Sequence, residues 1–567
     1  MLSAVALGPR VQTSSGVVEG NALPGANEFL GIPFGEPTRR FEAPEDLHRP
    51  YSSNPWPATD FGPACLQVGD SDDLVYGSED CLYANVWQPS GGAAAPGADL
   101  PVLVFIYGGS NQYGEAEPYN GSALAVRQGI IYVSIAYRTG PIGWMAFEED
   151  RAAGRSTGNY GLLDTQSGLR WVQREIRNFG GDPSKVAIHG QSSGAMLVEL
   201  HLVMPGSKGL LTGLVSESGG LSAAPLASGI RSSSAIGELV GCKGQSLKAC
   251  LQQAPAINLT SQTYSFGWGP HVDGVTVPAA PNDMLMHGRI NPINVMLGAQ
   301  TNDSLRELGK QYTGPDGHLT PLPASDYVKT VFMQVGARHI EDALLLYPAD
   351  PAGSMRNVQQ LGSISSDRMM CGIRRRLSLI NKVGKGRAYM YRFNWWYRSN
   401  PDCSAEPNYH LPELGAVHED EVTFVMGQPI FMFQGSCCGK WGPKLTREPC
   451  PQSPACVSCW QPKFGEGYHA YFNDKEWRFS ALVSGFWAAF AATGSPNGWS
   501  RTEAETGGPW PEFKSGEHIT RNIVLDADLP GMSTVESTLY NDPSVCAFWD
   551  RLEQHTSNAT APSVIAV

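Results

Sequence analysis

Apolar runs of strand length alternate along this chain with longer stretches of helical periodicity. We expect strands at residues 102–106, 130–135, 186–188, 214–216, 294–297 and 388–393. These runs are continuously apolar rather than alternating, which is typical of strands that are buried on both faces. Buried strands separated by helices predict an α/β fold in which helices cover both faces of a large, mostly parallel sheet.

A strand, a sharp turn and a helix are predicted around Ser192. Residues 186–188 form the expected strand, residues 195–200 the expected helix, and residues 190–194 between them spell Gly-x-Ser-x-Gly. Such a turn holds a serine hydroxyl clear of the sheet, and its glycines let neighbouring backbone come close. In a chain with 64 glycines the pattern also arises by chance. From these letters alone Ser192 is either a nucleophile or an ordinary turn serine.

Three longer strings resemble the type-B carboxylesterase and cholinesterase family of α/β-hydrolases. They are residues 179–194 around Ser192, residues 78–86 and residues 158–164. The resemblance extends from about residue 17 to about residue 552, with the motifs in the family's order. It implies the α/β-hydrolase fold and a serine nucleophile that cleaves carboxylic esters.

The composition fits one large globular enzyme. Hydrophobic residues make up 42% and charged residues 17% of the 567 residues, enough for a sizeable core. Because the motifs lie far apart in sequence and must meet in space, we expect a single α/β-hydrolase domain over residues 9–555. The net charge of −13 and the absence of a basic run exclude nucleic acid as an expected partner. No apolar run reaches the ~18–20 residues of a transmembrane helix.

The twelve cysteines indicate an oxidising compartment, since such a count in a secreted chain usually means disulfides. The resemblance implies three pairs, Cys65 with Cys81, Cys242 with Cys250, and Cys371 with Cys546. Four glycosylation sequons begin at Asn120, Asn258, Asn302 and Asn558. We therefore expect a secreted glycoprotein or one of the secretory-pathway lumen, with Asn302 unmodified because it adjoins a candidate catalytic residue. Residues 1–8 are apolar but lack a basic segment. They are a signal remnant, a truncated start, or a start near the mature end of the chain.

A cysteine-rich insertion at residues 428–476 departs from the family pattern. It carries most of the six cysteines that the resemblance leaves unpaired, namely Cys403, Cys437, Cys438, Cys450, Cys456 and Cys459. Six cysteines allow 15 pairings. Cys456 and Cys459 are spaced like zinc ligands, but no second such pair or nearby histidine completes a tetrahedral site. We expect disulfides here and no metal.

The resemblance also identifies a catalytic triad in the chain order serine, acid, histidine. His418 lies in a segment like the one that carries the family's histidine, with an acidic residue three positions on. Asp303 stands where the family usually has the catalytic glutamate, and Glu307 is the alternative acid. Ser192, Asp303 and His418 would then be the nucleophile, the orienting acid and the general base.

An oxyanion hole is expected after the strand that ends at residue 106. The backbone N–H groups of Gly109, Ser110 and Ser193 would meet the developing negative charge. The family's loop has a third glycine where Ser110 stands, so a side chain here would narrow the site or displace a donor. Ser218 and Glu421 would support His418 from behind, or serve the scaffold alone. Two internal salt bridges are also implied, Arg138 with Asp164 and Arg40 with Glu79.

The residues near the site disfavour a cationic substrate. Cholinesterases hold theirs against a tryptophan within the first disulfide loop, and residues 66–80 contain none. Gln191 also replaces the glutamate usual before their nucleophile. Tyr264, Phe266 and Trp268 either line an acyl pocket or belong to the core.

We therefore expect a serine carboxylesterase that acts on small-molecule or lipid esters of uncharged alcohols through an acyl-enzyme, without a cofactor. The alternative is a catalytically silent cholinesterase-like binding or adhesion module. The sequence does not specify an oligomeric state.

Overall fold

The computed structural model describes most of the chain. The described residues are 8–36, 39–69, 75–92, 94–242, 246–312, 314, 319–396, 414–427, 472–498, 509–514, 522–536 and 543–558. Nearly all of the predicted insertion at 428–476, with its cysteines, lies outside them, as do residues 1–7.

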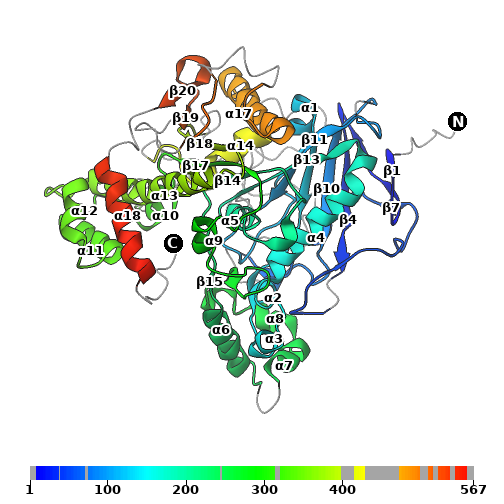
Figure 1. Cartoon of the computed structure of the whole chain (residues 1–567), viewed down its shortest axis with the longest axis horizontal. Helices are drawn as coiled ribbons and strands as arrows, with labels where there is room; N and C mark the ends of the chain where they lie inside the picture. Colours follow the sequence, from blue (N-terminus) through cyan, green and yellow to red (C-terminus); the bar gives the residue numbers. More distant parts are fainter. Residues whose placement is uncertain are drawn as a thin grey trace.

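An eleven-stranded sheet forms the centre of the molecule (Figure 1). Across the sheet its strands are β20 (Ser533–Glu536), β19 (Asn522–Leu525), β18 (Ala388–Phe393), β17 (Asn294–Gln300), β14 (Gly213–Glu217), β13 (Gly181–Gln191), β11 (Leu100–Ile106), β12 (Ile131–Ile135), β10 (Tyr83–Pro89), β4 (Ala26–Pro33) and β3 (Asn21–Leu23). Neighbours from β12 to β19 are parallel, whereas the outer strands pair antiparallel. The sequence prediction of a large, mostly parallel sheet is confirmed.

Helices cover both faces of this sheet. On one face α17 (Asp474–Thr493) packs on β11 and β13 beside α1 (Ser122–Gln128) and α14 (Asp420–Met426). On the other face lie α4 (Tyr160–Glu175), α5 (Ser193–Leu200) and α13 (Met355–Val383). Polar contacts join α4 to His201, the residue after α5, and α5 to α13. The strands between these layers are buried, as their continuous apolar runs predict.

The other described α-helices lie around these layers. They are α2 (Gly140–Trp144), α3 (Glu148–Ala152), α6 (Leu226–Leu239), α7 (Leu247–Gln253), α8 (Ala256–Thr260), α9 (Pro281–Met286), α10 (Leu305–Tyr312), α11 (Ala324–Val335), α12 (Ile340–Leu346) and α18 (Pro543–Asn558). No helix in the described part of the chain is long and apolar enough to cross a membrane.

Three disulfides fasten loops and helices to this core. The structure joins Cys65 to Cys81, Cys242 to Cys250, and Cys371 to Cys546. Their sequence separations are 16, 8 and 175 residues, so the third one ties α13 to the C-terminal helix α18.

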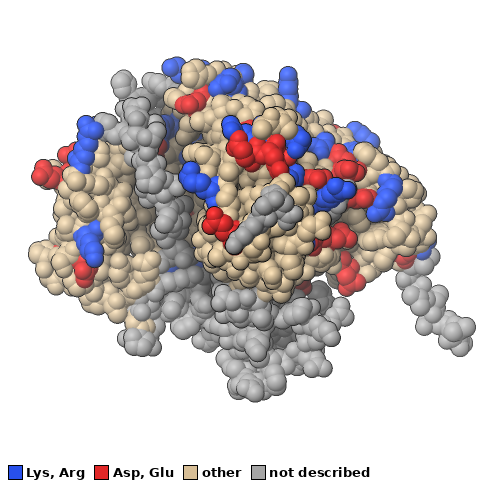
Figure 2. All heavy atoms as spheres, turned by 90° about the horizontal axis from the view of Figure 1, so that it is seen from below, with Lys and Arg blue, Asp and Glu red and all other residues tan. Residues whose placement is uncertain are grey.

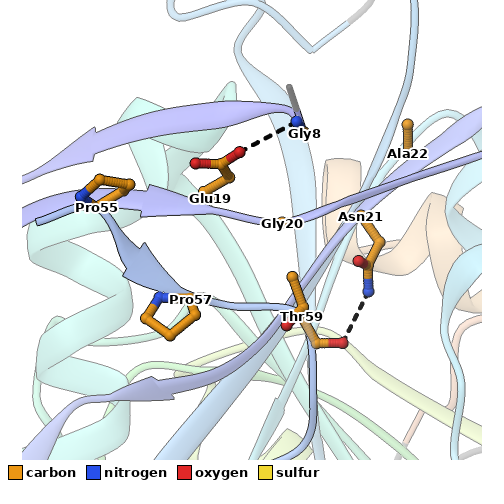
Figure 3. Close-up of a pocket in the computed structure, with 8 residues that line it drawn as sticks. All are labelled: Gly8, Glu19, Gly20, Asn21, Ala22, Pro55, Pro57 and Thr59. Carbon is orange, nitrogen blue, oxygen red and sulfur yellow. Dashed lines mark hydrogen bonds between the residues drawn. The ribbon is translucent and has the colours of Figure 1, made fainter. Parts of the chain in front are cut away.

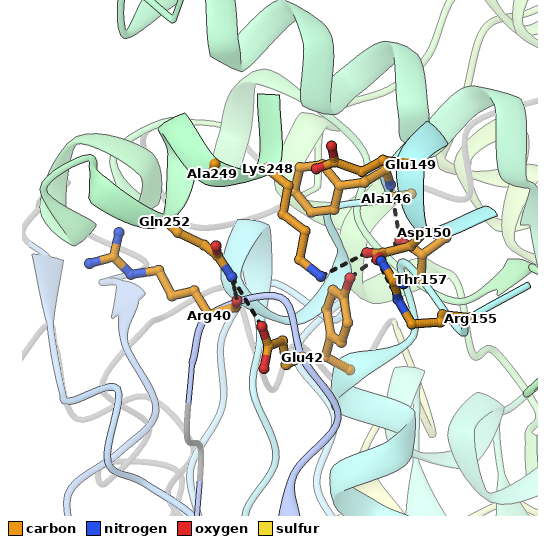
Figure 4. A network of polar contacts seen from close by, with 12 residues as sticks. Arg40, Glu42, Ala146, Glu149, Asp150, Arg155, Thr157, Lys248, Ala249 and Gln252 are labelled. Carbon is orange, nitrogen blue, oxygen red and sulfur yellow. Dashed lines mark hydrogen bonds and ion pairs between the residues drawn. The ribbon is translucent and has the colours of Figure 1, made fainter. Parts of the chain in front are cut away.

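A charged network anchors the Cys242–Cys250 loop (Figure 4). Lys248 of α7 and Arg155 both reach the buried carboxylate of Asp150 on α3, at 2.9 and 2.6 Å. Nearby, Arg40 pairs with Glu79 at 2.6 Å, and its guanidinium also donates to carbonyls near the end of α7. Each of these charged side chains contacts another residue of the fold, which indicates a structural role.

A shallow hollow of about 470 Å³ lies at the N-terminal edge (Figure 3). It adjoins the small sheet of β1 (Arg10–Thr13), β2 (Gly16–Glu19) and β7 (Trp56–Pro57). Its polar side chains are used internally, because Glu19 accepts from the Gly8 N–H and Asn21 donates to the Thr59 carbonyl. On the face seen from below, acidic and basic side chains are intermixed (Figure 2).

Candidate active site

Ser192 occupies a strained turn between β13 and α5. Its φ of 59° and ψ of −127° fall where non-glycine residues are rarely found. The flanking glycines are required by close backbone approach. A Cβ on Gly194 would lie 2.2 Å from the Ile106 carbonyl oxygen, and one on Gly190 would lie 2.7 Å from the same atom. The Gly-x-Ser-x-Gly residues therefore form a sharp turn that needs both glycines.

Backbone hydrogen bonds hold this turn from both sides. The Ser192 N–H donates to the Glu217 carbonyl at 2.9 Å, and the Ser192 carbonyl accepts from the Met196 N–H at 3.1 Å. Ser192 itself is partly exposed, whereas its neighbours Gln191 and Ser193 are buried. The turn thus presents one serine hydroxyl to the outside of the sheet.

Asp303 and His418 meet in space, although 115 positions separate them. Asp303 follows β17, and its Oδ1 lies 2.7 Å from Nδ1 of His418, which precedes α14. The other carboxylate oxygen accepts from the Gln300 N–H at 3.3 Å and lies 2.5 Å from the Ser218 hydroxyl. Asp303 is only 2% exposed, and the imidazole keeps 20% of its surface accessible. A buried acid therefore fixes a reachable imidazole by one ring nitrogen.

The pKa of His418 is raised above its ordinary value near 6.5. Burial alone lowers that pKa, but the negative charge of Asp303 and its hydrogen bond to the ring together outweigh burial, with a smaller contribution from Glu419. The imidazolium is therefore the form that Asp303 stabilises, as a general base paired with a carboxylate requires.

The loop after β11 turns back toward Ser192. Gly109 has a φ of 109°, and a Cβ there would lie 2.2 Å from the Tyr113 carbonyl oxygen, so only glycine fits. Ser110 adopts a φ of 55° and is exposed. At the position of the family's third glycine, the chain thus has an exposed serine with a left-handed backbone.

The candidate oxyanion donors are Gly109, Ser110 and Ser193. Among the described hydrogen bonds, none of their three backbone N–H groups donates to a protein acceptor. A Cβ on the preceding Gly108 would lie 3.0 Å from the Cβ of Ser192, so this loop runs directly against the nucleophile turn. The Ser193 hydroxyl accepts the next N–H of the loop, that of Asn111, at 3.1 Å.

Two stacked tyrosines lock the base of the same loop. The rings of Tyr107 and Tyr137 lie 4.7 Å apart at 23°, and the Tyr137 hydroxyl donates to the Tyr107 carbonyl at 2.8 Å. Burial raises the pKa of both hydroxyls, so they stay protonated donors. The stacking and the hydrogen bond hold the base of the loop in place.

A clamp on the histidine loop was not predicted. Arg306 of α10 forms an ion pair with Glu419 and lies 3.4 Å from the His418 carbonyl oxygen. Glu419 has a φ of 81°, unusual for a residue with a side chain. The only sequence signal was an arginine three positions after Asp303 and a glutamate directly after His418. Neither signal indicates that the two side chains meet.

The residues predicted to support the site or the scaffold differ in their contacts. Ser218, at a φ of 58°, holds Asp303 and also lies 2.5 Å from the Gln300 side-chain oxygen, so its single proton serves one acceptor at a time. Glu421 is fully buried in α14. Arg138 and Asp164 form a buried two-pronged pair at 2.7 and 2.8 Å, which indicates a scaffold role.

The candidate acyl-pocket segment lies near the oxyanion loop, but its three aromatic side chains differ in burial. Trp268 is buried and donates to the Thr263 carbonyl at 2.8 Å, and Phe266 packs edge-on against it at 6.0 Å. Tyr264 is 46% exposed. A Cβ on the following Gly269 would lie 3.1 Å from the side-chain nitrogen of Asn111, which brings the segment next to the oxyanion loop.

The first disulfide loop also reaches this region. Gln67, two residues after Cys65, exchanges two hydrogen bonds with the backbone of Gly114, at 2.7 and 3.1 Å. Residues 70–74 of the loop lie outside the described part. In the described residues no group of three or more His, Cys, Asp or Glu side chains is arranged to hold a metal ion.

Comparisons with known proteins point to one family. The chain matches the carboxylesterase family over residues 8–436. It is 27% identical to an acetylcholinesterase of Bungarus fasciatus over 97% of this chain and 87% of that protein. It is 34% identical to a cocaine esterase of Oryctolagus cuniculus over 52% of this chain and 59% of that protein. It is also 32% identical to an acylcarnitine hydrolase of Mus musculus over 52% and 56% of the two chains.

Proposed function

The chain belongs to the carboxylesterase family and is a carboxylic ester hydrolase; on that premise we propose that Ser192, His418 and Asp303 carry out the reaction through an acyl-enzyme. The observation that most supports these roles is the 2.7 Å contact between Asp303 and Nδ1 of His418. The strained and partly exposed turn at Ser192 supports them as well. Because Asp303 occupies Nδ1, the other ring nitrogen is the one available to Ser192.

The acylation step follows from these roles. His418 Nε2 takes the proton of the Ser192 hydroxyl as its oxygen attacks the ester carbonyl. The imidazolium that forms then donates this proton to the departing alkoxide, so that the alcohol leaves and the acyl group stays on Ser192. Asp303 remains ionised and stabilises the imidazolium throughout.

Deacylation repeats the sequence with water. His418 removes a proton from the water that attacks the acyl-serine and returns it to the Ser192 oxygen, releasing the carboxylic acid. In both steps the N–H groups of Gly109, Ser110 and Ser193 would stabilise the oxyanion. Each such donor is typically worth ~3–4 kcal/mol of barrier, and their lack of protein acceptors in the described structure supports this role.

We further propose that the preferred alcohols are uncharged. Gln191, the buried residue before the nucleophile, is a neutral amide, and a Cβ on Gly108 would lie 3.2 Å from its side-chain oxygen. The cationic Arg306 lies next to the histidine loop. Neither residue offers a negative charge to a cationic alcohol. Three disulfides further support residence in a secretory compartment.

Matched ester pairs test this proposal. The kcat/KM of acetylcholine is compared with that of 3,3-dimethylbutyl acetate, its uncharged isostere, and p-nitrophenyl butyrate reports general turnover. We expect the isostere to be cleaved at least as well as the choline ester, with all turnover lost in Ser192→Ala. A tenfold preference for choline would overturn the substrate class. Absence of Ser192-dependent turnover with every ester would support the alternative binding module.

A further inference from the structure

The loop that carries the candidate oxyanion donors turns back on itself after Gly109. The Gly109 carbonyl accepts from the N–H groups of Gln112 and Tyr113, at 2.9 and 3.1 Å. Gly114, which follows, has a φ of 128° and lies directly against the first leg of the loop, since a Cβ there would lie 2.5 Å from the Gly108 carbonyl oxygen. The position of Gly114 therefore constrains where the donor-bearing leg lies.

Gly114 is held in turn by a buried side chain of the first disulfide loop. Its N–H donates to Gln67 Oε1 at 2.7 Å, and its carbonyl accepts from Gln67 Nε2 at 3.1 Å. A peptide N–H only donates and a peptide carbonyl only accepts, so the pair sets both the place and the orientation of the Gln67 amide. Gln67 is fully buried, where a hydrogen bond is electrostatically stronger than in water.

The backbone of Gln67 is anchored within the disulfide loop. Gln67 lies two positions after Cys65, whose bridge to Cys81 closes that loop. Its short strand β8 (Gln67–Val68) pairs antiparallel with β9 (Val75–Tyr76). The side chain therefore extends from a fixed base to the oxyanion loop.

We propose that Gln67 is a positioning residue for the reaction: by bonding both backbone groups of Gly114, it keeps the N–H groups of Gly109 and Ser110 next to the Ser192 turn. This inference rests on the proposed function, which assigns those N–H groups to the oxyanion. Asparagine is one methylene shorter and an ionised glutamate lacks the donor, so neither replaces both bonds.

Gln67→Met tests this role because methionine has a similar length but lacks the amide that makes both bonds. Negative charge develops on the ester oxygen only as the reaction proceeds, so a displaced donor slows the chemical steps without weakening substrate binding. With p-nitrophenyl butyrate, kcat should fall about tenfold with an unchanged KM, a smaller loss than the ~100-fold expected when a donor itself is removed. The affinity for an alkyl trifluoromethyl ketone, which forms an oxyanion when Ser192 adds to it, should fall by the same factor.

Gln128→Met is the matched control. Gln128 is a buried glutamine of α1 whose side chain donates to the Ala481 carbonyl and the Ser484 hydroxyl, at 3.0 and 2.9 Å. Both variants should lose a comparable amount of stability in urea, but only Gln67→Met should change kcat and the ketone affinity. An unchanged kcat in Gln67→Met, or an equal loss of kcat in Gln128→Met, would overturn the inference.

Hydrogen exchange supplies a readout that does not depend on turnover. Deuterium uptake, measured by mass spectrometry, should rise over residues 107–116 in Gln67→Met and stay as in the wild type in Gln128→Met. Unchanged uptake over these residues in Gln67→Met would overturn this inference alone. Faster uptake in Gln67→Met, together with a wild-type protein that hydrolyses no ester, would overturn the proposed function alone.

Discussion

The role of Asp303 gives the sharpest quantitative prediction. Asp303→Asn keeps the size of the side chain but removes the charge that lies 2.7 Å from His418 Nδ1. Two unit charges about 4 Å apart interact by about 4 kcal/mol at an effective dielectric constant near 20. Each 1.36 kcal/mol of barrier is tenfold in rate, so kcat should fall about 10³-fold. A wrong imidazole tautomer would extend the loss toward the ~10⁴ typical of this change in a triad.

The pH profile of the same variant has a definite sign. His418 must be neutral to accept a proton, so activity is lost as pH falls through its raised pKa. Because Asp303 is what raises that pKa, Asp303→Asn should move the acid limb of kcat/KM to lower pH. The assay is p-nitrophenyl butyrate turnover between pH 4.5 and 9, with active protein counted by a fluorophosphonate probe.

Glu307→Gln is the competing variant, since Glu307 is the other acid suggested by the sequence. An Asp303→Asn protein that keeps more than a tenth of kcat, with an unmoved acid limb, would refute the reasoning. A large loss in Glu307→Gln instead would transfer the role to that residue.

Three further changes test the scaffold of the site. Gly109→Ala places a Cβ 2.2 Å from a carbonyl oxygen, so kcat should fall more than ~100-fold with an unchanged circular dichroism spectrum; a normal kcat would contradict the loop assignment. Arg306→Met should lower the free energy of unfolding in urea by ~3 kcal/mol, and adding Glu419→Gly should recover part of it because glycine accepts the φ of 81°; additive losses would contradict the clamp. Replacing Cys371 and Cys546 by serine opens a link across 175 residues and should cost ~4–5 kcal/mol in the same assay; an unchanged midpoint would show that this bridge adds no stability.

The parallel core could be predicted because buried parallel strands have a strong sequence signal. The apolar runs at 102–106 and 214–216 fall inside β11 and β14. The helical stretches between the predicted strands indicate that the strands are parallel. The prediction at 186–188 covers only the middle of β13, which runs from Gly181 to Gln191. Residues 181–185 contain no apolar run, and of them only Gly181 pairs with β11, across a register shift that no periodicity indicates.

The outer strands and the support of the site could not be predicted in this way. Antiparallel strands such as β4 carry little apolar periodicity of their own and depend on β10 for pairing. The contact between Arg306 and Glu419, and that between His189 and Glu217, join residues far apart in sequence. Such pairs depend on how the sheet and loops bring them together, which a local pattern does not contain.

The central claim is that Ser192 is the nucleophile. The most direct test is to treat the native protein with a fluorophosphonate, digest it and locate the adduct by mass spectrometry. The account predicts one adduct, on the peptide that contains Ser192, with loss of p-nitrophenyl butyrate turnover in proportion to labelling and no adduct in Ser192→Ala. Full turnover in Ser192→Ala, or an adduct on another residue that accounts for inhibition, would contradict it.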